Sequence, residues 1–153
     1  MGIARRRMTA RRSLDYEWTY LYGSVCPSKG LAHGLLLPYA DLEGMRLYSD
    51  DFSRSLERHV YALLVCDRAG WHTSGRLSIP ENVGILFLPP KSPELNPGEL
   101  LWREMRQKHL GNSVFPDVDN LCAAVCEAWL AVTKNTQSLK SLCGFNWIAD
   151  ILK

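Results

Sequence analysis

Two acidic residues stand where the secondary structure expected from this sequence would concentrate reactive groups. Asp67 directly follows the apolar run 62–66, and Glu99 follows a second apolar run, 83–88, after a proline-rich loop. Short apolar runs of this kind predict buried strands. Open α/β sheets bind their ligands at the edge where parallel strands end. We therefore expect Asp67 and Glu99 to meet at one edge of a sheet.

Carboxylates at such an edge can hold a hard divalent cation such as Mg²⁺. A pair of these ions can activate the attacking oxygen and stabilise the leaving oxygen in phosphodiester cleavage. Each acid also has a purely structural explanation. Asp67 can cap the turn after its strand, and the run Asn96-Pro97-Gly98-Glu99 matches a helix capping box with Asn96 as the N-cap. The spacing alone leaves both explanations open. Of the neighbouring polar residues, we expect His72 to be a hydrogen-bonded structural histidine and Glu94 to be exposed.

The composition is that of an ordinary globular protein. The chain has 153 residues, of which 46% are hydrophobic and 22% charged, and this length fits one domain. No apolar run is long enough to cross a membrane, and the N-terminus lacks the apolar segment of a signal peptide. We therefore expect a cytoplasmic protein with no membrane partner. The five cysteines form no CxxC pair, which predicts free, buried thiols and no zinc site.

The N-terminus is strongly basic. Five arginines lie between residues 5 and 12, no acidic residue precedes Asp15, and the rest of the chain is mildly acidic. Such a segment is either a disordered leader or an arm that binds nucleic acid phosphates. We expect residues 1–15 to form this basic arm and residues 16–153 to form the folded domain.

The hydrophobic pattern predicts a mixed sheet flanked by helices. The first two strands form a hairpin, and later strands alternate with helices, which indicates an α/β sandwich with a partly parallel sheet. The expected strands are 16–25, 31–37, 62–66 and 83–88, and the expected helices are 42–59, 97–110, one from about 118, and one or two short ones within 139–153.

Three segments resemble one known family. The segment Leu64–His72 reads as an apolar run followed by D-x-A-x-x-H, and Leu88–Trp102 reads L-P-P-K-S-P-E-L-N-P-G-E-L-L-W. The segment Tyr16–Gly23, with the turn at Cys26-Pro27, resembles the same family's second strand. These motifs are similar to those of the DDE superfamily transposases of bacterial insertion sequences, within them the branch related to mariner elements. Lys91 replaces the tyrosine that is common there.

This resemblance implies an RNase H-like fold in which Asp67 is the second acid of a catalytic triad and Glu99 the third. Both would bind Mg²⁺ or Mn²⁺. The implied activity is nicking of DNA at transposon ends, followed by joining of the freed 3′-OH to target DNA. The implied partners are therefore the two kinds of DNA site, transposon ends and target.

The first acid of the triad has no counterpart in this sequence. In the family it lies on the central strand, well before the position of Tyr16, and Asp15, Asp41, Asp50 and Asp51 are not at that position. The family's N-terminal helix-turn-helix domain has no counterpart either. We therefore expect the C-terminal part of the catalytic domain, an RNase H-like mixed sheet that lacks its first, central strand.

Without the first acid we expect the triad to be incomplete and the chain to be inactive alone. We expect any Mg²⁺ to be bound weakly, and the partner to be a full-length transposase protomer or an upstream fragment. A decayed remnant, a frameshifted gene and a late start codon remain alternative origins. The alternative function is a non-catalytic remnant that binds DNA or a transposase.

Overall fold

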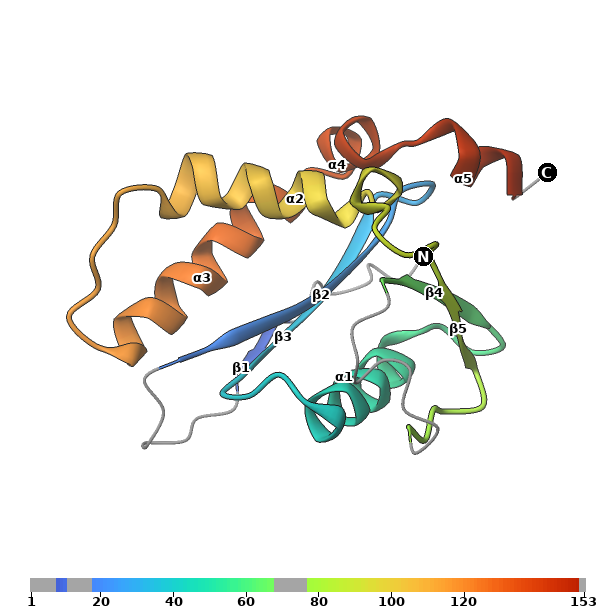
Figure 1. Ribbon diagram of the computed structural model, residues 1–153, viewed down its shortest axis with the longest axis horizontal. Helices are drawn as coiled ribbons and strands as arrows, with labels where there is room; N and C mark the ends of the chain where they lie inside the picture. The colour runs from blue at the N-terminus through green and yellow to red at the C-terminus, as the bar shows by residue number, and fades with distance from the viewer. Residues whose placement is uncertain (1–7, 11–17, 68–76, 152–153) are drawn as a thin grey trace. The chain divides into compact units, whose positions relative to one another are not determined.

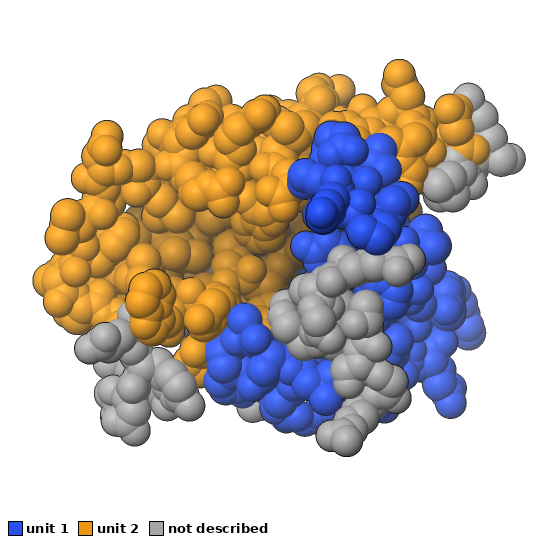
Figure 2. Space-filling model, viewed as in Figure 1, with its two compact units in different colours: residues 1–5, 39–96 blue, residues 6–38, 97–153 orange. Residues whose placement is uncertain are grey.

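The computed structural model describes residues 8–10, 18–67 and 77–151, and these fall into two compact units (Figure 2). Of the described residues, one unit contains 39–67 and 77–96, and the other contains 8–10, 18–38 and 97–151. Both are mixed α/β structures with small sheets (Figure 1), which is consistent with the expected RNase H-like class.

The second unit is built on a hairpin. Strands β2 (Tyr20–Cys26) and β3 (Leu31–Leu37) are antiparallel, and the turn between them is closed by a 2.8 Å hydrogen bond from the Gly30 N–H to the Cys26 carbonyl. Gly30 has a φ of +63°, which glycine adopts without strain. The predicted hairpin is therefore confirmed. A further strand, β1 (Met8–Ala10), pairs with β3 in parallel and was not predicted, because three residues carry no readable alternation.

Helices α2 (Gly98–Met105), α3 (Val118–Thr133) and α4 (Thr136–Cys143) pack with this hairpin and with one another, and α5 (Asn146–Ile151) follows. Side chains of Asp117 and Asn135 cap α3 and α4 by accepting from backbone N–H groups, each at 2.8 Å. The core of this unit consists of eight buried residues: Leu36, Leu101, Met105, Val125, Ala128, Trp129, Leu139 and Cys143. Val125, Ala128 and Trp129 of this core lie on α3, the helix expected from about residue 118.

Two tryptophans are stacked against the hairpin. The rings of Trp102 on α2 and Trp129 on α3 have centroids 5.6 Å apart and an interplanar angle of 30°. Beneath them lie Gly23 and Gly34, which are directly opposite each other in the sheet. The absence of side chains at these two positions is what allows the rings to approach the backbone.

The first unit contains one helix and two parallel strands. Helix α1 (Leu42–Ser55) is capped by the Asp41 carboxylate, which accepts from the Gly44 N–H at 2.8 Å. Strands β4 (Ala62–Cys66) and β5 (Val83–Phe87) are paired in parallel register, as Figure 1 shows. Their predicted positions are confirmed to within one residue.

Asn82 connects the elements of this unit. Its side-chain oxygen accepts from the Ser53 hydroxyl of α1 at 2.5 Å, and its amide donates to the Ser53 carbonyl at 3.3 Å. Its own carbonyl accepts from the Ala62 N–H at 2.9 Å. One residue thus joins α1 to the start of both strands.

Several sequence expectations differ in detail from this structure. The helix expected over 42–59 ends at Ser55, and the helix expected over 97–110 changes at Arg106 to a wider π-helical turn, Arg106–Leu110. Within the described ranges, one unit contains a sheet of order β1-β3-β2 and the other a sheet of order β4-β5. The missing central strand and the domain boundary at residue 16 stay predictions. The five cysteines are free, as expected, but only Cys143 is buried and the other four are partly exposed. None of the helices in the described ranges is long and apolar enough to span a membrane.

Candidate functional site

Asp67 directly follows β4, at the edge where both strands of its sheet end. The Cys66 carbonyl accepts a 2.8 Å hydrogen bond from the Leu88 N–H, which extends the ladder just past the end of β5. Because β4 and β5 are parallel, both strands end at this edge of the sheet. The side chain of Asp67 is exposed there. The structure therefore places Asp67 as the sequence predicted.

The residue before Asp67 is Cys66, a partly buried thiol. Burial raises the pKa of the Cys66 thiol to about 11, and the neighbouring Asp67 charge acts in the same direction. A thiol with this pKa stays protonated at neutral pH. Asp67 is the carboxylate that follows the end of β4.

Glu99 lies in the first turn of α2, and its side chain is exposed. The helix begins at Gly98 with Pro97 as its N-cap, and no side-chain hydrogen bond caps it. Glu99 therefore occupies the second helical position and not the third, so the capping box predicted with Asn96 as the N-cap is wrong by one residue. The positive end of the helix dipole still favours a carboxylate at this position.

The start of α2 is held in place by α4. The Cys143 side chain is fully buried, and its thiol lies 3.6 Å from the Pro97 carbonyl, to which it donates a hydrogen bond. Burial raises the pKa of this thiol to about 11, so the proton that it donates is retained at neutral pH. Leu139, one turn earlier on α4, is also fully buried in the same core. The helical turn that carries Glu99 thus rests on a packed support.

The two acids belong to different units, Asp67 to the one with β4 and Glu99 to the one with α2. The structure gives the surroundings of each acid only within its own unit. That Asp67 and Glu99 meet at one site therefore stays a prediction. Within the ranges that the structure covers, no three His, Cys, Asp or Glu side chains lie close enough together to hold a metal ion.

The other acidic candidates have separate roles or positions. Asp41 caps α1, and Asp50 forms an ion pair with Arg46 at 3.2 Å. Glu94, in the short 3-10 helix Pro93–Leu95, is exposed as predicted. Predictions for His72, for Asp15 and for the five arginines before it fall outside the described residues, whereas Met8–Ala10 between those arginines form β1.

Sequence reasoning missed two arginines that follow Glu99, Arg103 on α2 and Arg106 at the start of the π-helical turn. Arg103 and Arg106 follow Glu99 by four and seven positions, and the spacing of four places Glu99 and Arg103 on one face of α2. All three side chains are exposed, and neither arginine has an ion-pair partner among the residues that the structure describes. The helical spacing from Glu99 is the signal that could have identified them.

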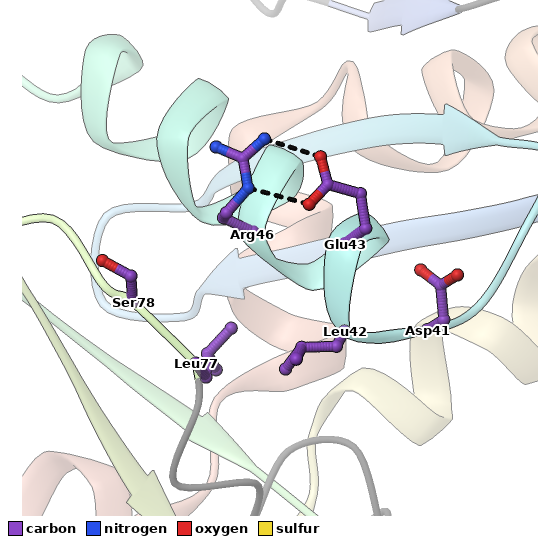
Figure 3. Close-up of a pocket in the computed structure, with 6 residues that line it drawn as sticks. All are labelled: Asp41, Leu42, Glu43, Arg46, Leu77 and Ser78. Carbon is purple, nitrogen blue, oxygen red and sulfur yellow. Dashed lines mark hydrogen bonds and ion pairs between the residues drawn. The ribbon is translucent and has the colours of Figure 1, made fainter.

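A cavity of about 390 Å³ lies at the N-terminal end of α1 (Figure 3). It is lined by Asp41, Leu42, Glu43, Arg46, Leu77 and Ser78. The Arg46 guanidinium makes two hydrogen bonds to the Glu43 carboxylate, at 2.6 and 2.9 Å, and these hold the pKa of Glu43 below its usual range. Because this arginine is already neutralised and neither Asp67 nor Glu99 lines the cavity, we do not assign it to the site.

Comparison with known proteins agrees with the motif resemblance. Residues 4–122 match the family model described as DDE superfamily endonuclease. An uncharacterized protein of Sinorhizobium fredii is 40% identical over 130 residues, which cover 85% of this chain and 96% of that protein. No solved structure matches.

Proposed function

The chain belongs to the DDE superfamily endonucleases, and on that premise we propose that it is the C-terminal part of a transposase catalytic domain of the mariner-related branch. In this proposal it acts on DNA, at transposon ends and target sites, and it is cytoplasmic. The observation that carries the proposal is the position of both acids. Asp67 and Glu99 lie inside the matched region 4–122, one at the end of a parallel strand and one in the first turn of a helix.

Asp67 and Glu99 are the residues that would hold the divalent ions used by this family. Both offer exposed carboxylate oxygens, the donor type that Mg²⁺ and Mn²⁺ prefer. The bound ions would supply activation of the attacking oxygen and stabilisation of the leaving oxygen. The protein's own contribution is to fix the two carboxylates, through the β4–β5 ladder for Asp67 and through the Cys143–Pro97 contact for Glu99.

We propose that the first acid of the triad comes from a polypeptide segment other than these 153 residues. The sequence has no acid at the family's first position before Tyr16. Two carboxylates alone leave most of an octahedral Mg²⁺ shell to water, so they would hold the ion weakly. The chain would therefore bind DNA by itself but cleave it only when the missing segment is supplied.

Arg103 and Arg106 would bind DNA phosphates beside the cleavage position. Arg103 lies one helical turn beyond Glu99 on α2, and Arg106 begins the π-helical turn that follows. Both side chains are exposed. Arginine suits this role because its planar fork can donate two hydrogen bonds to one phosphate.

Replacing Arg103 or Arg106 by alanine is expected to weaken DNA binding. Each lost phosphate contact should reduce the slope of log K against log salt by about 1. The measurement is fluorescence anisotropy of a short labelled DNA duplex over a series of salt concentrations. Lys134→Ala is the matched control, because Lys134 is an exposed cation of the same unit at the end of α3. Equal losses in all three variants would mean that only net charge matters.

The alternative function, a non-catalytic remnant that binds DNA or a transposase, predicts a different combination of results. DNA binding would still depend on Arg103 and Arg106, but the chain would not cleave DNA even with an upstream segment supplied. Asp67→Asn and Glu99→Gln would then leave every measured property unchanged.

A further inference from the structure

Lys91 has a left-handed backbone conformation in the loop that joins β5 to the helix carrying Glu99. Its φ is +59°. This conformation is unfavourable for a residue with a β-carbon, because the β-carbon lies too close to the following carbonyl oxygen. Glycine, asparagine and aspartate are the residues that commonly adopt it. A lysine is therefore a costly choice for the backbone at this position.

No contact of the Lys91 side chain offsets this cost within the described ranges. None of the hydrogen bonds and ion pairs there involves its ammonium group, and the side chain is exposed. The backbone conformation is instead fixed from both sides, since the rings of Pro90 and Pro93 restrict the loop and the Leu95 N–H bonds to the Ser92 carbonyl at 3.1 Å. Strained positions that the surroundings hold in place are concentrated at ligand-binding and catalytic sites. We therefore expect the Lys91 charge to act on a bound partner and not on the fold.

Lys91 lies close to the edge of the sheet at which Asp67 stands. The Leu88 N–H bonds to the carbonyl of Cys66, the residue before Asp67, at 2.8 Å. Lys91 follows Leu88 by three residues, so its backbone lies within roughly 11 Å of that of Leu88. All four residues belong to one unit, so this proximity does not depend on the placement of the other unit.

We propose that Lys91 binds a DNA phosphate beside the carboxylate of Asp67. The inference rests on the proposed function, because that function supplies DNA as the partner. A lysine ammonium is a compact positive charge with three donors, which suits a phosphate oxygen. Arg103 and Arg106 belong to the other unit. Lys91 would therefore give the unit that contains Asp67 a DNA contact of its own.

Lys91→Asn in the full chain separates this role from a structural one. Asparagine removes the charge but adopts the left-handed conformation more readily than lysine. The affinity for a short labelled DNA duplex should fall roughly fivefold at about 0.15 M salt, and the slope of log K against log salt should decrease by about 1. The midpoint of thermal unfolding, followed by circular dichroism, should not fall. Lys91→Arg keeps the charge and should retain the parent salt slope.

Arg58→Asn is the matched control for net charge. Arg58 is an exposed cation of the same unit, and it lies in the turn before β4. Because β4 and β5 are parallel, this turn is at the opposite edge of the sheet from Asp67. The affinity of this variant for DNA should stay within about twofold of the parent, because it loses no phosphate contact. An equal loss in Arg58→Asn and Lys91→Asn would overturn the proposal in favour of a net-charge effect.

The Lys91 inference and the proposed function fail in different ways. Parent-like DNA binding by Lys91→Asn, together with weakened binding by Arg103→Ala, would overturn the role of Lys91 alone. A lower unfolding midpoint in Lys91→Asn with unchanged DNA binding would assign the lysine to the fold. A parent chain that binds no DNA would overturn the proposed function, and the inference about Lys91 with it.

Discussion

Asp67→Asn and Glu99→Gln are each expected to lower the rate of metal-dependent DNA nicking by at least about 10³-fold, when a polypeptide that supplies the proposed first acid is present. The physical reason is that each substitution replaces a carboxylate, which the proposal assigns to the metal ion, by a neutral amide of the same shape. The measurement is the conversion of supercoiled plasmid to nicked circles in Mg²⁺ or Mn²⁺. Binding to DNA should persist, because the proposed phosphate contacts come from Arg103 and Arg106.

Glu94→Gln is the control for this experiment. Glu94 is an exposed carboxylate of the same motif, five residues before Glu99, and the proposal gives it no role in metal binding. Its replacement should leave the nicking rate within about twofold of the parent. A rate that falls equally in all three variants would assign the effect to net charge, and unchanged rates in Asp67→Asn and Glu99→Gln would exclude both residues from the chemistry.

Gly23→Ala is expected to destabilise the unit that contains the hairpin by about 2–3 kcal/mol. A β-carbon at Gly23 would lie 2.6 Å from Cη2 of Trp102 and 2.7 Å from Cη2 of Trp129. Trp129 is only 2% exposed, so it has no free space to move into, and the partly buried Trp102 is stacked against it. Urea denaturation followed by tryptophan fluorescence measures the loss.

Gly84→Ala provides a matched comparison for the glycine effect. Gly84 is also a strand glycine, but its added β-carbon would meet the end of the Tyr61 side chain, which is 64% exposed and can rotate away. The cost should therefore be below about 1 kcal/mol. If Gly84→Ala is as destabilising as Gly23→Ala, the tryptophan stack is not the cause.

The sequence predicted the elements of this fold well because their patterns are local. The alternating segment around Tyr20 and the apolar runs that became β3, β4 and β5 were identified within a few residues. The position of Asp67 at the end of β4 could also be predicted, because Asp67 directly follows the apolar run in the sequence. Helix ends were less accurate, and Ser55 ends α1 four residues early, because caps depend on backbone geometry that amphipathic spacing does not contain.

Features that depend on residues far apart in the chain could not be predicted from the sequence. The approach of Trp102 and Trp129 to Gly23 requires the hairpin register and the packing of two helices, none of which is local. The contact between Cys143 and Pro97 joins residues 46 positions apart in the chain. Sequence reasoning also misplaced the start of α2, because Pro97 fits both the N-cap and the first helical position.

Titration of Mn²⁺ followed by electron paramagnetic resonance tests most directly whether Asp67 and Glu99 form one metal site. The measurement compares the parent chain with Asp67→Asn, Glu99→Gln and the double variant. The account predicts that each single substitution lowers the affinity for the same Mn²⁺ ion. The double variant should bind Mn²⁺ only slightly less tightly than the more affected single variant, because both residues would hold one ion. Parent-like Mn²⁺ affinity in the double variant would contradict it.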